Sequence, residues 1–539
     1  HPDGLADPVD YLTRLRGVLG VDRWLVVEKI LGADEELDPA LPVAGTTGYD
    51  ALRELGGVFV DPAGAHALSE LTRERTGTPG DAGDLAVTEQ ELKRSVARAG
   101  LRPELERCVR AMPSGTVAHA ELVEAVVELV AAVPVYRADY PVLAGLLPGV
   151  VARVAAEYPE SSMALEHVAA ALIAGGEAAT RFQQVCGAVT AKGVEDCLFY
   201  RTTRLTSLQE VGGDPKRFGV TPAEFHLAAS ERARHWPAAM TTLSTHDTKR
   251  GEDVRARITV LSEVPGLWAA SLARWEEVAP SPDGAMGSLL WQAMFGVWPA
   301  DGRTGAEVPL LRERLHAYAE KAVREAGTRT EWNEVNTEFE SALHAWLDAV
   351  LDGPVAASMT ELVAGLAPHG WSNSLGQKLL QLIGPGVPDV YQGTELWEDS
   401  LVDPDNRREV DFAARADLLS TLDTPVVDPT GAAKLLVVSR ALQLRRERPA
   451  SFVGGSYAPV LAEGAKAAHL VGFARGPAGA EPDVIAVATR LPVNLDGWGP
   501  TTVPLPPGQW TDRLTGVDHR GDTPVAALLD RLPVALLVR

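Results

Sequence analysis

The chain has 539 residues, enough for more than one domain and a large apolar core. Its 73 acidic and 50 basic residues give a formal net charge of −23, which argues against binding to nucleic acids or anionic membranes, since both require concentrated lysine and arginine. Three cysteines without CxxC spacing, Cys108, Cys186 and Cys197, argue against a disulfide framework and a structural zinc site. This sparse set makes a reducing cytoplasm the expected location. No run approaches the roughly 20 apolar residues that span a bilayer.

The first part of the chain, residues 1–66, alternates between helical and strand-like patterns. Residues 8–18 predict a short helix, and residues 23–28 form an apolar run that ends in a charged residue, Glu28. Buried parallel strands are typically continuous in apolar residues and meet a polar residue where they emerge. The alternation therefore favours a parallel α/β sheet or barrel.

The next part, residues 67–187, is rich in Ala, Glu, Leu and Val at helical spacing. Val123, Val126, Val127 and Val130 follow the i, i+3, i+4, i+7 pattern that places side chains on one face of a helix. We therefore predict an all-helical insertion.

Residues 188–448 return to the α/β pattern, and residues 449–539 differ from both. Short strands are predicted at residues 187–195, 238–247 and 387–391, and helices at residues 284–383 and 432–448. After Pro449 the apolar runs are short and separated by Gly and Pro, at residues 469–474, 484–489, 509–510 and 534–538. This spacing predicts a C-terminal antiparallel β domain, which we expect to be a sandwich.

Two carboxylates stand at the ends of predicted strands. Glu28 lies where a (β/α) barrel carries its active site, although a surface glutamate paired with Lys29 explains the local sequence as well. Asp247 and His246 together could hydrogen-bond neighbouring sugar hydroxyls. Alternatively, Asp247 or Thr248 caps the helix that carries Glu252.

Three further polar segments lie near predicted strand ends. They are residues 43–50, where Tyr49 could form a wall against a sugar ring, residues 191–196, and residues 403–408. A plain turn explains residues 43–50 equally well, and it is the more usual explanation of the other two segments, because Asp, Asn, Gly and Pro are the usual turn residues.

Taken together, Glu28 and Asp247 are stronger evidence for a catalytic site than either residue alone. Glycosidic chemistry needs one acid to protonate the leaving oxygen and one group to stabilise a charged sugar ring, and retaining enzymes add a third carboxylate as nucleophile. No metal-ligand spacing, P-loop, dinucleotide fingerprint or G-x-S-x-G elbow competes with this interpretation, and no cofactor or metal is expected.

At this point the chain resembles the maltooligosyl trehalose synthase family of the α-amylase superfamily. The matching strings are spread nearly end to end, at residues 1–8, 27–31, 43–50, 191–196, 244–250, 373–377, 388–395 and 403–408. The resemblance implies a (β/α)8 TIM barrel, incomplete at its N-terminus, with large helical insertions and the C-terminal β domain. The four expected segments are residues 1–66 (barrel), 67–187 (insertion), 188–448 (barrel with a second insertion) and 449–539.

The resemblance also implies roles for individual residues. Glu28 falls at the position of the general acid/base, and Asp247 at that of the aspartate that stabilises the transition state. The implied substrate-binding residues are His1, His246, Tyr49, Lys192, Glu195, Asp196, Tyr200, Arg201, Lys249, Arg250, Asp405 and Arg407. The family's nucleophile, an aspartate directly before the His-x-Asp-Gly-Leu string, would precede His1, and Asp3 is a poor substitute because it is displaced along the motif.

The activity implied by the resemblance is that of a (1→4)-α-D-glucan 1-α-D-glucosylmutase, which converts the reducing-end α-1,4 linkage of a maltooligosaccharide to an α,α-1,1 linkage. Glu28 must then be protonated at the first step, so we expect the Lys29 side chain to point away from it. A maltooligosyl trehalose hydrolase is the implied functional partner. Two alternatives remain open: an ordinary α-glucan hydrolase or transglucosylase, and an inactive glucan-binding fragment whose nucleophile lies upstream of His1.

Overall fold

The computed structural model describes residues 1–402, 405–423 and 425–539. The chain divides into two compact units. Unit 1 comprises His1–Asp50, Asp81–Arg201 and Gly212–Lys216, and unit 2 comprises Ala51–Gly80, Thr202–Val211 and Arg217–Arg539. Each unit is built from segments that are far apart in sequence.

Unit 1 is mainly helical. Its helices are α1 (Pro8–Leu19), α4 (Ala82–Arg98), α5 (Arg102–Arg110), α6 (His119–Ala132), α7 (Leu146–Glu157), α8 (Ser162–Ala174), α9 (Gly176–Thr190), the π-helix η5 (Ala191–Leu198) and α10 (Phe199–Arg201), with 3₁₀ turns η1 (Pro2–Gly4), η3 (Pro141–Leu143) and η4 (Pro159–Ser161). The first helix begins as its sequence dictates, because Asp7 accepts a hydrogen bond from the Asp10 amide and Pro8 occupies the first turn.

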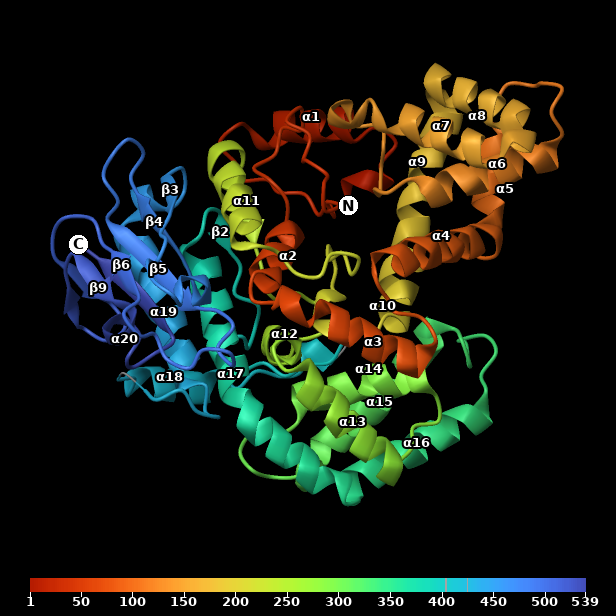
Figure 1. Ribbon diagram of the computed structural model, residues 1–539. Coiled ribbons are helices and arrows are strands. Elements are labelled where there is room, and N and C mark those ends of the chain that lie inside the picture. Colours follow the sequence, from red (N-terminus) through yellow and green to blue (C-terminus); the bar gives the residue numbers. More distant parts are fainter. Residues whose placement is uncertain (403–404, 424) are drawn as a thin grey trace. The chain divides into compact units, whose positions relative to one another are not determined.

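The core of unit 1 lies among α5 to α9, which form the orange and yellow helical group in Figure 1. The four valines predicted to share one helix face, Val123, Val126, Val127 and Val130, all lie in α6 and are at most 1% exposed. This prediction is confirmed, since a buried face with helical spacing is what the i, i+3, i+4 pattern requires.

The apolar run that ends at Glu28 forms one parallel bridge, between Val27 and Thr46. The Val27 amide donates to Gly45 O, and the Thr47 amide donates to Val27 O. The predicted strand is therefore reduced to a single bridge, but the segment after it, residues 43–47, is its partner.

Unit 2 combines helices with sheets. Its helices are α2 (Tyr49–Gly57, in this unit from Ala51 on), α3 (Ala65–Thr76), α11 (Pro222–His235), α12 (Glu252–Thr259), α13 (Pro265–Val278), α14 (Gly284–Val297), α15 (Pro309–Ala326), α16 (Thr337–Asp352), α17 (Val355–Ile383), α18 (Phe412–Ser420), α19 (Ala432–Glu447) and α20 (Val525–Leu528). Shorter 3₁₀ turns are η2 (Pro62–Gly64), η6 (Thr206–Leu208), η7 (Val260–Ser262), η8 (Gly305–Glu307), η9 (Asp405–Arg407), η10 (Pro449–Ser451) and η11 (Ala467–His469).

A short parallel pair lies in unit 2. Met240 and Thr241 of β1 pair with Val387 and Pro388 of β2, and both strands stop after two residues. Two of the predicted strands, at residues 238–247 and 387–391, are thus adjacent and parallel. The Gln381 side chain of α17 donates to Thr241 O and Asp389 O, which ties the two strand ends together.

The C-terminal part of unit 2 contains a six-stranded sheet with the order β3-β4-β5-β10-β7-β8, drawn in blue in Figure 1. Its strands are β3 (Ser456–Pro459), β4 (Leu470–Gly476), β5 (Val484–Thr489), β7 (Trp510–Asp512), β8 (Asp518–His519) and β10 (Val534–Val538), all antiparallel, while β6 (Thr502–Pro504) pairs with β9 (Asp522–Pro524). The predicted antiparallel sheet is therefore observed.

The central strand β5 is apolar on both faces because each face packs into a different apolar core. Val484, Ala486 and Ala488 join a core shared with α17 and α19, whereas Ile485 and Val487 face a second core. A strand buried on both sides reads as a continuous apolar run rather than as an alternating one.

One predicted strand is wrong. Residues 187–195 are helical, because they span the end of α9 and the π-helix Ala191–Leu198. Val185, Cys186 and Val189 of α9 are buried in the core of unit 1. Over such a short length, a buried helix cannot be distinguished from a strand by its apolar residues.

Within the described ranges, no single helix has the length and apolar character needed to cross a membrane. Two bent pairs, Pro141–Glu157 with Pro159–Ala174 and Thr337–Asp352 with Val355–Ile383, meet that test together by length and composition alone.

Candidate active site

Glu28 is held in unit 1 directly after the Val27–Thr46 bridge. Its side chain is 25% exposed, and its Oε2 lies 3.3 Å from His1 Nε2. The structure thus brings together a predicted acid/base and a predicted substrate-binding residue. The histidine side chain is 70% exposed, which leaves most of its surface open to a ligand.

Lys29 does not pair with Glu28. Its buried ammonium lies 3.1 Å from Asp3 Oδ2 and 2.7 Å from Glu35 Oε1, and 5.5 Å from the centre of the Tyr140 ring. The Lys29 cluster (Asp3, Lys29, Glu35 and Tyr140) therefore directs the positive charge away from Glu28, as expected from the sequence. Burial raises the pKa of the Glu35 carboxyl, and Lys29 acts in the opposite direction.

Asp3, the weak substitute for a nucleophile, is occupied by structural contacts. It is 8% exposed, pairs with Lys29, and accepts a hydrogen bond of 2.9 Å from the Tyr140 hydroxyl. The Arg137 guanidinium donates to the backbone of the same turn, at Asp3 O and Leu5 O. These contacts fix the first turn of unit 1 against the Glu28 segment.

The π-helix Ala191–Leu198 carries three of the predicted substrate-binding residues. Lys192 is 65% exposed and pairs with Asp196 at 2.6 Å, and Glu195 accepts a hydrogen bond from the Tyr136 hydroxyl. Burial and the Glu195 charge raise the pKa of Tyr136. Single-turn π-helices often occur at functional sites.

Three other predicted residues of unit 1 differ in exposure. Tyr200 in α10 and Tyr49 at the start of α2 are each 2% exposed, whereas Arg201 in α10 is partly exposed. The Tyr49 ring is thus packed inside the protein in this conformation rather than presented as an open wall.

Asp247 and His246 lie in unit 2, in a turn that follows β1. His246 Nε2 lies 3.4 Å from Asp247 Oδ2, and the two side chains are 56% and 43% exposed. The alternative role as a helix cap does not apply, because Gly251 is the N-cap residue of α12. Both side chains are thus free of a capping role and accessible to a sugar.

The turn at residues 245–248, which we term the Asp247 loop, is closed by its own threonines. The Asp247 amide donates to Thr245 Oγ1 at 3.1 Å, and the Thr248 hydroxyl donates to Thr245 O at 2.9 Å. Local hydroxyl-to-backbone bonds of this kind stabilise turns.

Glu210 anchors the residues that follow this loop. Its buried carboxylate accepts hydrogen bonds from the Lys249 amide (2.6 Å), the Arg250 amide (3.2 Å) and the Arg255 guanidinium (3.2 Å). Nothing in the sequence around Glu210 indicated this role, because its partners lie about 40 residues away along the chain.

Two predicted residues of this segment are placed differently from each other. Arg250 is 2% exposed, and it donates to Gln209 O and to the Tyr318 hydroxyl. Its neighbour Lys249 is partly exposed.

The polar segment at residues 403–408 is described from Asp405 onward, and Asp403 and Pro404 lie outside the described residues. Asp405 binds the Arg314 guanidinium through both carboxylate oxygens, at 2.9 Å each. Arg407 is exposed. Of these two predicted residues, Asp405 is therefore committed to a salt bridge with Arg314, whereas Arg407 retains exposed surface.

A buried charge cluster lies beneath the start of α12. Glu252 lies 2.7 Å from Lys378 and 2.8 Å from Lys434, and Asp253 lies 2.7 Å from Lys434. Burial raises the pKa of Glu252 and the two ammonium groups lower it, and the net shift is downward. Ser244, just before the Asp247 loop, donates to Glu252 at 3.1 Å, which connects this cluster to the loop.

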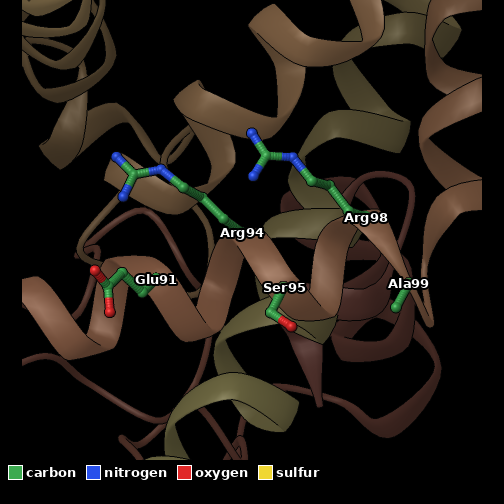
Figure 2. Close-up of a pocket in the computed structure, with 5 residues that line it drawn as sticks. All are labelled: Glu91, Arg94, Ser95, Arg98 and Ala99. Carbon is green, nitrogen blue, oxygen red and sulfur yellow. The ribbon is translucent and has the colours of Figure 1, made fainter.

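Among the described residues, no group of three or more His, Cys, Asp or Glu side chains could hold a metal ion. Figure 2 shows a surface pocket of about 460 Å³ along α4, lined by Glu91, Arg94, Ser95, Arg98 and Ala99. Both of its arginines bind Glu128, and Arg98 also binds Glu124. Because its positive charges are neutralised and no predicted site residue lines it, this pocket is not the candidate site.

Comparisons with known proteins agree with one another. A curated protein of Mycobacterium tuberculosis, provisionally named a maltooligosyl trehalose synthase, is 52% identical over 542 residues, which span 100% of this chain and 68% of that protein. The structure of maltooligosyltrehalose synthase from Arthrobacter ramosus matches with 47% identity and a TM-score of 0.92, covering 100% of this chain and 69% of that chain. The hypothetical maltooligosyl trehalose synthase of Sulfolobus tokodaii matches with 27% identity and a TM-score of 0.81, covering 100% and 68%. No family model matches the chain.

Proposed function

Because this chain belongs to the maltooligosyl trehalose synthase family, we propose that it catalyses the conversion of the reducing-end α-1,4 linkage of a maltooligosaccharide to an α,α-1,1 linkage. This activity is an intramolecular transglucosylation, the reaction of a (1→4)-α-D-glucan 1-α-D-glucosylmutase, and it serves trehalose biosynthesis. The observation that carries the proposal is the 52% identity along the whole chain.

Glu28 is the proposed general acid and base. In the first step it donates its proton to the oxygen that links the last glucose, and a carboxylate captures the remaining chain as a glycosyl-enzyme. In the second step Glu28 takes a proton from the anomeric hydroxyl of the reoriented glucose. The hydroxyl oxygen then attacks the anomeric carbon of the glycosyl-enzyme and displaces the carboxylate. The position of Lys29 supports this role for Glu28, because the Lys29 ammonium forms ion pairs with Asp3 and Glu35 instead.

Asp247 is the proposed stabiliser of the positively charged sugar ring, and His246 the proposed ligand of a sugar hydroxyl. Both side chains are about half exposed and adjacent, as a ligand requires. A fixed carboxylate next to developing positive charge lowers the barrier without having to reorganise.

Water must be kept from the glycosyl-enzyme, because hydrolysis competes with the transfer. We infer that the π-helix Ala191–Leu198, which carries the exposed Lys192, closes over the retained glucose. The same proposal includes a (β/α) barrel architecture, a cytoplasmic location, and a maltooligosyl trehalose hydrolase that acts on the product.

The test is product analysis on maltopentaose, performed on this chain and in parallel on the longest open reading frame that contains it. The expected result is a loss of reducing ends without release of glucose, at least in the longer protein. Equal release of glucose or maltose would instead indicate a hydrolase, and a complete lack of turnover in both proteins would contradict the proposal.

Two variants refine this test. Glu28→Gln and Asp247→Asn should each lower kcat by a factor of at least about 1,000, as expected when a proton donor or a fixed charge is lost. Glu36→Gln is the matched control, because Glu36 is an exposed glutamate on the same segment as Glu28.

A further inference from the structure

Asn406 lies at the centre of the turn η9 (Asp405–Arg407) and is 9% exposed. It is the middle residue of a polar segment whose neighbours, Asp405 and Arg407, were the expected sugar ligands. A buried amide in such a segment needs a structural reason, because burying an amide without partners opposes folding.

The reason is a contact with the Asp247 loop. The Asn406 side-chain amide donates two hydrogen bonds, to Thr245 O at 3.0 Å and to His246 O at 3.1 Å. Because two carbonyl oxygens face the same end of the side chain, only its NH2 group can be placed there. The two bonds hold the carbonyl groups of Thr245 and His246, and the second of these belongs to the peptide bond that leads into Asp247.

The turn that carries Asn406 is itself fixed. Arg314 binds Asp405 through two parallel hydrogen bonds, and the Tyr391 hydroxyl donates to Asn406 O at 3.2 Å. Bidentate arginine–carboxylate pairs define an orientation as well as a distance. Asn406 therefore connects the Asp247 loop to a rigid support.

The other end of Asn406 argues against a role in stability alone. Its Oδ1 is buried and has no hydrogen-bond partner among the described residues. An unsatisfied buried acceptor opposes folding, whereas an apolar side chain at the same place would not carry this cost. The residue is thus best explained by its two donated bonds.

We propose that Asn406 is a positioning residue that fixes the orientation of Asp247 and His246 for the reaction. This inference rests on the proposed function of those two side chains. Since Asp247 acts on the charge that develops in the transition state, a loosened loop should lower kcat much more than it changes KM.

The experiment compares Asn406→Ala and the isosteric Asn406→Asp with the parent protein on maltopentaose. Asp replaces the NH2 group by an oxygen that faces two carbonyl oxygens, so it disturbs the loop while keeping the shape. We expect kcat to fall at least tenfold in both variants and KM to change less than threefold. Hydrogen exchange of the peptide covering residues 243–250 should become faster, with no change in peptides from unit 1.

The matched control is Gln292→Ala. Gln292 is a buried amide of the same unit that donates to Thr203 O and accepts from the Thr206 amide, so it supports a different segment. This variant should lose thermal stability with kcat within threefold of the parent and with unchanged exchange at residues 243–250.

The outcomes separate the inference from the function. Parent-like kcat and parent-like exchange at residues 243–250 in both Asn406 variants would overturn the positioning role. A parent protein that does not isomerise maltopentaose would overturn the proposed function, and the exchange measurement would still decide whether Asn406 holds the loop.

Discussion

The segments that carry Glu28 and Asp247 are both held by a buried ion, but the two ions have opposite charge. In unit 1 the cation Lys29 is surrounded by acceptors, the carboxylates of Asp3 and Glu35. In unit 2 the anion Glu210 is surrounded by donors, three backbone amides and the Arg255 guanidinium. The comparison suggests that each arrangement fixes the backbone next to a proposed functional carboxylate without placing an opposite charge on that carboxylate.

The difference lies in what remains when the central ion is removed. Without Lys29, two carboxylates stay buried close to each other, and like charges repel. Without Glu210, three of the four donors are backbone amides, which are neutral, and Arg255 keeps its bonds to Arg250 O and Leu243 O. Removal of the central ion should therefore lower the free energy of unfolding more in the unit 1 cluster than around Glu210.

The largest expected effect is that of Lys29→Met. Removing one member of a buried ion pair typically costs about 3–5 kcal/mol in the free energy of unfolding, and urea denaturation at pH 7 would measure it. Arg14→Met is the control, because Arg14 is 73% exposed in its pair with Asp10. A loss below about 1 kcal/mol would show that the cluster is not a significant support.

Glu210→Gln should have the next largest effect. The variant keeps the shape but loses the charge for Arg255 and turns an NH2 group toward the Lys249 or Arg250 amide, at a cost of about 2–3 kcal/mol. Because Lys249 and Arg250 follow the Asp247 loop, kcat on maltopentaose should fall as well. If unfolding is affected and kcat is not, then Glu210 supports the fold and not the site.

How far sequence could anticipate this arrangement depends on the range of the contacts. The buried face of α6 and the strand β5 were predictable, because their apolar spacing is local. The Lys29 cluster, Glu210 and Asn406 were not, since each joins residues that are distant in sequence; Asn406 and His246 are 160 positions apart. The segment at residues 187–195 was wrongly expected to be a strand because an apolar run of that length fits a buried helix equally well.

For the predicted site residues too, the sequence located positions but not their contacts. Motif strings located Glu28 and Asp247, and the structure gives both of them exposed surface. The strings could not distinguish a residue that faces a ligand from one that holds its neighbour. Arg250 and Asp405 are mainly engaged with other protein groups, whereas Lys192 and Arg407 are exposed.

Glu263 is a further buried carboxylate, with amide donors but no ion pair among its described contacts. It accepts from the Val493 and Asn494 amides, and burial raises its pKa from 4.5 to about 7. A raised native pKa means that the stability contributed by the protonated form is complete below pH 4.5 and is lost as the pH rises through about 7.

Glu263→Gln should therefore stabilise the protein only at higher pH. The amide resembles the protonated carboxyl, so at pH 8 the variant should gain about 1–3 kcal/mol in the free energy of unfolding, and at pH 4.5 close to nothing. Melting temperatures of both proteins at the two pH values measure this difference. A gain of the same size at both pH values would mean that protonation is not its cause.

The smallest expected effect on stability belongs to Lys192→Ala, which tests the opposite extreme, an exposed ion pair. Lys192 is 65% exposed in its pair with Asp196, and exposed pairs contribute less than about 0.5 kcal/mol, so the free energy of unfolding should hardly change. If Lys192 helps to close the pocket over the retained glucose, the ratio of released glucose to isomerised product should nevertheless rise, because water then reaches the glycosyl-enzyme. Arg181→Ala, which removes a partly exposed pair on the preceding helix α9, should leave this ratio unchanged. An unchanged ratio in Lys192→Ala would remove Lys192 from the proposed closure and would leave the buried clusters as the structural supports of the site.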